Sequence, residues 1–135
     1  MATSDVFSVV VSSGSLRPID HHGVVMPHRW TADGVVVEAE FTGAHLYHLA
    51  AAGCVLNDVH REAQQLGIAV DGVRVTARGA FDTTTWASLG VTYTIDVDSP
   101  ADAAAVGHLI AVVEDVAEIP KALSQAAQVS RTSGT

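Results

Sequence analysis

The sequence of 135 residues contains one cysteine, Cys54, so no disulfide can form within a single chain. A small fold held together by disulfide bridges is therefore excluded. Two interpretations of the thiol remain open. Cys54 is either a small buried hydrophobic side chain or a reactive group.

Basic residues and long apolar runs are also scarce. Seven Lys and Arg stand against fifteen Asp and Glu, for a net charge of −8, and the basic residues are scattered singly. This pattern argues against nucleic acid as a partner.

The longest apolar stretches, such as residues 49–56, are far short of the ~20 residues that span a bilayer. The N-terminal MATSDVF lacks a basic segment followed by an apolar one, so we expect a cytoplasmic protein with no membrane partner.

The sequence is rich in apolar residues. Hydrophobic residues make up 48% of the sequence and charged residues only 16%, which predicts a folded chain. The length suits a single domain over residues 1–135. A monomer of this size has little interior volume for so much Val and Ala. We therefore expect a homodimer.

The first half of the chain predicts strands followed by a long helix. Residues 6–12 are rich in β-branched side chains, and residues 23–26 can form a short strand between prolines. Residues 35–41 alternate, which predicts a half-buried strand with Val36, Glu38 and Glu40 facing solvent. A helix then follows, with Thr42 as its N-cap and Gly67 as its C-terminal stop.

The second half repeats this order. Residues 73–77 and 91–97 alternate and predict an antiparallel pair of strands. Ser99 is the expected cap of a second long helix, which Pro120 interrupts before a short further turn. Residues 128–132 are a candidate closing strand. The sequence thus predicts an α+β fold in which helices pack on an antiparallel sheet.

The first long helix carries the sharpest chemical feature. Helical spacing gives one face with Cys54 and a neighbouring apolar face. Asp58, one turn after Cys54, would raise the pKa of the thiol, and Arg61 mainly pairs with Asp58. The N-terminus of this helix is too distant to act on Cys54. Activation would need an arginine from elsewhere, and the candidates are Arg17 and Arg29. The face of Cys54 holds Tyr47, Ala51, Cys54, Asp58, Arg61 and Gln65; the apolar face holds Leu46, Leu49, Ala50, Gly53, Leu56 and Ala63.

Other site patterns are weak. His45 and His48 are three residues apart and could bind a metal with His60 or Asp58, but polar surface or interface histidines are the favoured interpretation. No glycine-rich phosphate loop precedes a helix, and no serine lies in a nucleophile elbow. We expect no metal and no cofactor.

Several segments together resemble the osmotically induced protein C and organic hydroperoxide resistance (OsmC/Ohr) family. They are HLYHLAAAGCVLNDVHREAQQLGIAVDGVRVTARGAFD and GVTYTIDVDSPAD, followed by a second long helix and KALSQA. The resemblance covers roughly residues 34–129. It implies an OsmC-like α+β fold with two long central helices, an intertwined homodimer with active sites at the interface, and thiol-dependent reduction of hydroperoxides. In that chemistry a second cysteine resolves the sulfenic acid formed on the first.

The family's site residues carry over only in part. Cys54 matches the cysteine that attacks the peroxide. The resolving cysteine would fall near Ala117 and is absent, and the family's glutamate would fall at Ala44 and is also absent. Arg17 lies in the region of the family's arginine. Because Ala117 takes the approximate place of the second cysteine, we expect Glu118 to approach Cys54.

Two functional hypotheses follow. In the first, Cys54 reduces an organic hydroperoxide or a related electrophile, and an external thiol then resolves the sulfenic acid formed on Cys54. In the second, the chain is a diverged dimer that binds a small molecule, or performs non-redox chemistry, in its interface cleft while Cys54 only packs. The candidate catalytic residues are Cys54, Arg17, Asp58, Arg61 and Glu118, and the candidate substrate-binding residues are His45, His48, Tyr47 and Asn57.

Overall fold

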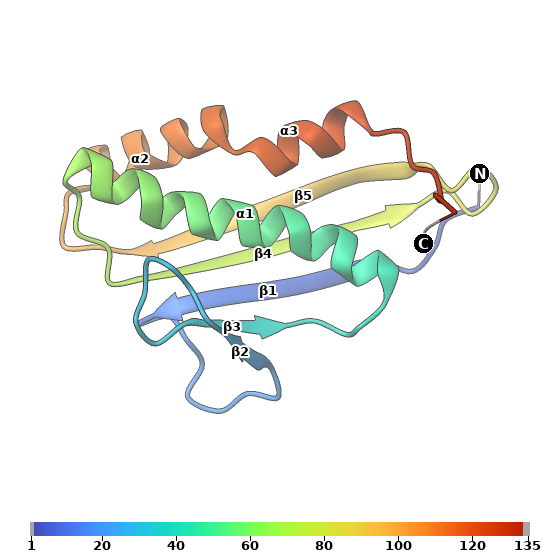
Figure 1. The fold of residues 1–135 in the computed structure, drawn as a ribbon. Helices are drawn as coiled ribbons and strands as arrows, with labels where there is room; N and C mark the ends of the chain where they lie inside the picture. Colours follow the sequence, from blue (N-terminus) through green and yellow to red (C-terminus); the bar gives the residue numbers. More distant parts are fainter. Residues whose placement is uncertain (1, 134–135) are drawn as a thin grey trace.

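The structure is a computed structural model and describes residues 2–133. Five antiparallel strands form one sheet in the order β2-β3-β1-β4-β5, and three helices lie on one of its faces (Figure 1). This is the predicted α+β architecture. In chain order the elements are β1 (Phe7–Gly14), β2 (Val24–Met26), β3 (Val35–Glu38), α1 (Gly43–Leu66), β4 (Gly72–Phe81), β5 (Ser88–Asp98), α2 (Ala103–Val116) and α3 (Glu118–Gln125).

The ends of α1 are the predicted ones. Thr42 Oγ1 accepts a hydrogen bond from the His45 backbone N–H at 3.1 Å, which caps the first turn. Gly67 adopts the left-handed conformation, with φ 69°, and its N–H bonds back to the last turn.

The second helix starts differently from the prediction. Asp102, not Ser99, caps α2, because the Ser99 hydroxyl donates to the Ala69 carbonyl at 2.6 Å.

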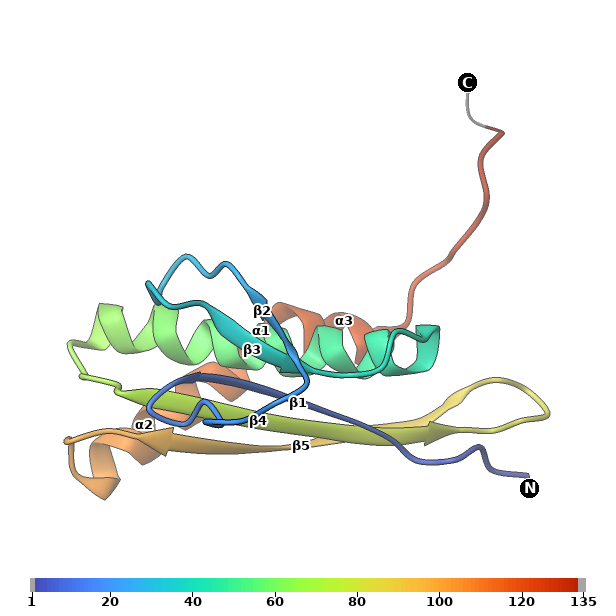
Figure 2. The same cartoon turned by 90° about the horizontal axis from the view of Figure 1, so that it is seen from below.

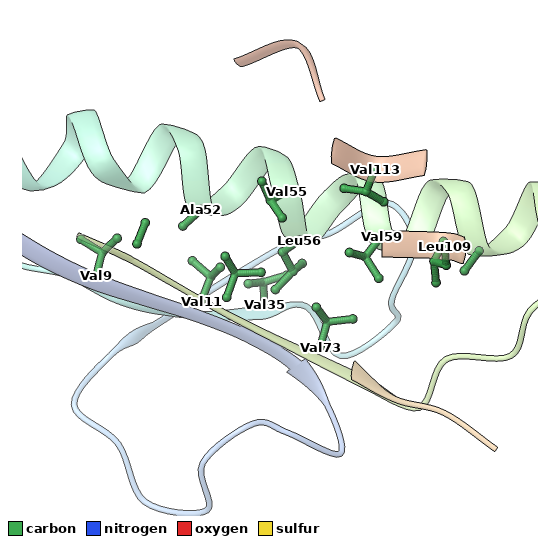
Figure 3. Packing of buried hydrophobic residues seen from close by; sticks show 13 residues of the cluster. Val9, Val11, Val35, Ala52, Val55, Leu56, Val59, Val73, Leu109 and Val113 are labelled. Carbon is green, nitrogen blue, oxygen red and sulfur yellow. The ribbon is translucent and has the colours of Figure 1, made fainter. Parts of the chain in front are cut away.

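The core lies between α1 and the sheet (Figure 3). Val9 and Val11 of β1 and Val73 and Val75 of β4 project toward α1. Helix α2 closes the C-terminal half of α1 with Leu109 and Val113, both fully buried. The side chains of α1 in this core are Ala52, Val55, Leu56, Val59 and Ala63.

The predicted apolar face of α1 is divided between the core and an open groove of about 340 Å³. Leu56 and Ala63 belong to the core, and the other four residues line the groove, which Leu56 also borders. Of these four, Leu49 also packs against the core. The core stripe is rotated around the helix, because α2 and α3 pack against α1 as well as the sheet. The buried surface of α1 therefore includes the polar residues His48, Asp58 and Glu62. The four groove residues are Leu46, Leu49, Ala50 and Gly53.

The predicted third strand is shorter than expected and its burial is different. β3 ends at Glu38, and Phe41 is 91% exposed. Val36 was expected to face solvent but is fully buried beside Ser12, its partner in the register with β1. Ser12 is fully buried as well, so the outer face of the sheet is covered at this position.

The C-terminal elements also differ from the prediction. Pro120 does not interrupt α2, which ends at Val116, but lies in the first turn of α3, where a missing N–H is tolerated. Residues 128–132 form no strand. Figure 2 shows the chain leaving α3 in a direction away from the sheet, so these residues have no strand edge to pair with.

Candidate functional site

The candidate site lies on the flank of α1 that faces α2 and α3. Cys54, Asp58 and Arg61 share this flank because they are spaced by four and three residues. Asp58 Oδ2 lies 3.8 Å from Cys54 Sγ and 3.2 Å from Arg61 Nη2. Asn57 Nδ2 donates to the other carboxylate oxygen at 3.2 Å. The Asp58 side chain has no exposed surface, whereas Arg61 is 30% exposed. A buried carboxylate is thus held beside the thiol by two donors.

Helix α3 brings a second carboxylate to Cys54. The ligand atoms of Cys54, Asp58 and Glu118 all lie within 4.8 Å of one another, so the expected approach of Glu118 is confirmed. The chain turns at Ala117, whose backbone is extended, and α3 then runs along α1 (Figure 1). Asp58 is fully buried and Glu118 is exposed, so the acidic pair is open to solvent on one side only.

The same turn places the N-terminus of α3 against the sulfur. Ala117 has no side chain that could cap the first N–H groups of α3. Hydrogen bonding from the backbone of Ile119 and Glu118 lowers the pKa of the Cys54 thiol. A helix N-terminus stabilises a thiolate. The N-terminus of α1 itself is distant from Cys54, and nothing in the sequence around Cys54 indicates that another helix begins there.

The balance of these effects raises the pKa of Cys54. Burial raises it most, and the negative charges of Asp58 and Glu118 raise it further. Burial also raises the pKa of Asp58, against the opposing effects of Asn57 and Arg61. Cys54 is therefore a protonated thiol at neutral pH, next to a carboxylate that can accept its proton.

A cavity of about 360 Å³ lies between α1, β5 and α3, and Cys54 itself is not part of its lining. Ala51 lies one turn before Cys54, and Pro120 follows the two α3 residues that contact the sulfur. Burial, followed by the nearby Glu114 and Cys54, raises the pKa of the Tyr93 phenol, which faces the same space. The cavity is lined by Tyr47, Ala51, Ser88, Gly90, Val91, Tyr93, Pro120, Leu123 and Ser124. None of these described residues is charged, so the cavity suits a neutral and partly apolar molecule.

The structure separates the other predicted site residues from Cys54. Arg17 Nη1 donates to the Asp33 carbonyl at 2.9 Å, and the charged groups that shift the thiol pKa are Asp58 and Glu118. The second candidate arginine, Arg29, stacks over the Trp30 ring, with 5.6 Å from its Cζ to the ring centroid.

The candidate substrate-binding residues are divided among four places. Tyr47 lines the cavity, and Asn57 contacts Asp58. His45 lies 3.3 Å from Glu40 and borders a different hollow. His48 is fully buried, and its Nδ1 donates to the Ala44 carbonyl.

Cys54, Asp58 and Glu118 also have the spacing of metal ligands. Within residues 2–133, they are the one group of three such side chains that converge. The oxygen of Asp58 that faces the thiol is already paired with Arg61, which supplies the positive charge that a metal would bring. Arg61 would therefore compete with a metal ion for this carboxylate oxygen. In the described residues, no helix is both long and apolar enough to cross a bilayer.

Comparison with known proteins agrees with this architecture. No curated protein sequence matches the chain. Among solved structures, an OsmC-like hydroperoxide resistance protein from Jannaschia sp. CCS1 is similar, with a TM-score of 0.60, 14% identity and 96% coverage of both chains. At this identity the likeness concerns the fold. The sequence model of the family described as OsmC-like protein matches residues 36–131, which is 96 of the 135 residues. The chain therefore belongs to the OsmC-like protein family.

Proposed function

We propose that this OsmC-like protein reduces organic hydroperoxides with Cys54 as its one redox-active cysteine. The observation that carries the proposal is the position of Cys54 Sγ, 3.8 Å from Asp58 Oδ2 and one helical turn after Ala51, which lines the uncharged cavity. The cavity would hold the organic part of the substrate. The backbone at the start of α3 would stabilise negative charge on the sulfur.

The first step transfers one oxygen atom. Asp58 accepts the thiol proton, and the sulfur electron pair attacks the terminal oxygen of the hydroperoxide. The O–O bond breaks, and the leaving alkoxide takes the proton back from Asp58. Cys54 becomes a sulfenic acid and the hydroperoxide becomes an alcohol, so the sulfur is oxidised by two electrons.

An external thiol completes the cycle, because this chain has no second cysteine. A low-molecular-weight thiol attacks the sulfenic acid, releases water and forms a mixed disulfide with Cys54. A second thiol molecule then releases the Cys54 thiol and leaves as a disulfide. Because the pKa of Cys54 is raised, little thiolate exists at neutral pH, and we expect slow turnover that accelerates as pH rises.

Intact mass tests the first step directly. The protein is treated with one equivalent of cumene hydroperoxide, and we expect one added oxygen atom on the chain. Cys54→Ser must show no such addition. Cumene alcohol should form in equal amount, and a thiol such as dithiothreitol should restore the original mass. An unchanged mass, with the hydroperoxide intact, contradicts the proposal.

A second candidate function is binding of a neutral small molecule without redox chemistry. The observation that favours it is the raised pKa of Cys54, with no arginine among the groups that shift it. Ligand binding in the cavity would then survive in Cys54→Ser and be lost in Ala51→Trp, which fills the cavity from α1. The same two variants, treated with cumene hydroperoxide and measured for its reduction, separate the two functions.

We further propose that the functional unit is a homodimer. The groove along α1 is lined mainly by apolar side chains, among them Leu46 and Leu49, and the edge strand β2 exposes Val24, Val25 and Met26. A second copy of the chain would cover this surface. Sedimentation should give a species of about twice the 14.0 kDa chain mass at micromolar concentration. A 14.0 kDa species under those conditions contradicts the proposal.

A further inference from the structure

The segment between β2 and β3 contacts α1 through His28. His28 Nδ1 lies 2.9 Å from Thr31 Oγ1, and His28 Nε2 lies 3.1 Å from Asn57 Oδ1. Because a carbonyl oxygen only accepts hydrogen bonds, His28 Nε2 must be the donor. The Thr31 contact fixes the other side of the ring. His28 therefore holds the Asn57 side-chain amide in one orientation.

Asn57 passes this orientation on to the buried carboxylate. With its oxygen turned to His28, its Nδ2 donates to Asp58 Oδ1 at 3.2 Å. The second oxygen, Oδ2, then faces Cys54 at 3.8 Å and Arg61 at 3.2 Å. A continuous chain of polar contacts thus links a segment outside the candidate site to the thiol.

We propose that His28 is a positioning residue for Cys54, which acts through Asn57 to keep one oxygen of the Asp58 carboxylate against the thiol. This inference rests on the proposed function for its role in peroxide reduction, but the geometry exists independently of it. Without the His28 contact, the Asn57 amide is free to rotate. Asp58 Oδ1 then has no fixed donor, and the carboxylate can turn away from the sulfur.

The consequence for Cys54 has a defined sign. A carboxylate turned away repels a thiolate less and no longer accepts the S–H hydrogen bond, so the pKa of Cys54 falls. Asp58 also carries the thiol proton to the leaving alkoxide, and this proton transfer is lost at the same time. The thiol therefore becomes more ionised while peroxide reduction becomes slower. Other titratable groups face this region and stay in place: Arg61 and Glu62 on α1, Glu118 on α3, Glu114 on α2, Tyr93 on β5, and His60, whose ring packs on His28.

The experiment measures the rate of Cys54 alkylation by iodoacetamide against pH, in parallel with the rate of cumene hydroperoxide reduction. In His28→Phe we expect the alkylation midpoint to fall by about half a pH unit or more. The peroxide rate should fall at least about tenfold, because a general base contributes about 10²–10⁴-fold and here it is displaced but not removed. Asn57→Ala breaks the same chain from the helix and should match His28→Phe. His28→Gln keeps an N–H donor for Asn57 and should restore wild-type values.

Two controls separate positioning from general damage. His108→Gln changes an exposed histidine on α2 and should leave both profiles unchanged. In the Asp58→Asn background, His28→Phe should produce no further shift, because its effect passes through the carboxylate. An additive shift in this double variant overturns the proposal, as does a His28→Gln variant that behaves like His28→Phe.

The alkylation readout also distinguishes this inference from the proposed function. If wild type does not reduce the hydroperoxide but His28→Phe still shifts the alkylation midpoint, the positioning role stands and the peroxidase function fails. If wild type reduces the hydroperoxide and no midpoint shift occurs, the positioning role fails alone.

Discussion

The two buried sides of α1 differ in chemistry although they belong to one helix. The side that faces the sheet is apolar, and Ala52, Val55 and Val59 have no exposed surface. The side that faces α2 and α3 holds the carboxylates of Asp58 and Glu62, which are also buried. Apolar burial stabilises a fold by about 25 cal/mol per Å². A buried charge costs free energy unless it is fully paired.

This difference indicates what each side is for. The sheet-facing side supplies the stability of the domain, because its packing is dense and needs no special partner. The α3-facing side costs stability at neutral pH, since burial raises the pKa of Asp58 above its ordinary value. A feature that costs stability and lies beside a cavity is a candidate for function. The predictions below test this division.

The largest expected effect is on the sheet-facing side. Leu56→Ala removes a side chain that is 2% exposed and leaves a cavity between α1 and the sheet. We expect the free energy of unfolding to fall by about 2–5 kcal/mol. Urea unfolding followed by circular dichroism measures it. At temperatures where the variant stays folded, the alkylation midpoint of Cys54 should not move. A large midpoint shift would contradict the separation of the two sides.

Gly79→Ala tests the N-terminal end of the same side. A Cβ atom at Gly79 would lie 2.3 Å from the Gly90 carbonyl oxygen and 2.4 Å from His48 Nε2. The backbone of β5 has to shift to make room, and we expect a loss of about 1–3 kcal/mol. Thermal unfolding measures the loss. Gly53→Ala is the matched control, because nothing lies within 4 Å of its Cβ position and Ala favours the helix. Equal stability of the two variants would contradict the close packing of β4 on α1.

His60 gives a smaller effect that depends on pH. Burial, with a further contribution from His28, lowers the pKa of His60 from 6.5 to about 4. The unfolded chain therefore binds the proton more tightly, and the free energy of unfolding falls as pH drops from about 6.5 to about 4. Because the ring is partly solvated, we expect a loss of about 1 kcal/mol. His60→Gln keeps a polar contact for Ser13 and should remove this part of the pH dependence. If the free energy of unfolding depends on pH in the same way in wild type and in His60→Gln, this prediction is wrong.

The sheet-facing side was largely predictable from the sequence. Alternation in β4 and β5, the Thr42 cap and the Gly67 stop all follow local rules of one element, and the structure confirms them. The division of the buried surface of α1 between the sheet and the other two helices was not predictable, because α2 and α3 pack against the same helix. Periodicity within one helix does not contain that information.

The candidate site was predictable in composition but not in geometry. The spacing of Cys54, Asp58 and Arg61 predicted the Asp58–Arg61 ion pair and the direction of the Asp58 effect on the thiol. The start of α3 at Glu118 and the contact of His28 with Asn57 depend on how distant segments meet. For the approach of the start of α3 to Cys54, the one signal in the sequence was the family resemblance, which placed Ala117 near Cys54.

The smallest expected change in stability comes from Asp58→Asn. The raised pKa of Asp58 means that the folded state holds its proton more tightly than the unfolded chain, so this carboxyl destabilises the fold as pH rises through its folded pKa. The amide removes the buried charge and keeps the shape, and Arg61, which is 30% exposed, can turn to solvent. We expect the free energy of unfolding at neutral pH to stay within about 1 kcal/mol of wild type, or to rise slightly.

The chemistry of Asp58→Asn should change far more than its stability. Removal of the negative charge lowers the pKa of Cys54, and alkylation at neutral pH becomes faster. Peroxide reduction loses its proton acceptor, and we expect it to slow by at least about tenfold. Urea unfolding, iodoacetamide alkylation and cumene hydroperoxide consumption measure the three quantities on one preparation. A loss of more than about 3 kcal/mol with no change in alkylation would assign Asp58 and Arg61 to structure, since broken buried ion pairs cost that much. In that case the two sides of α1 would not be divided between stability and chemistry.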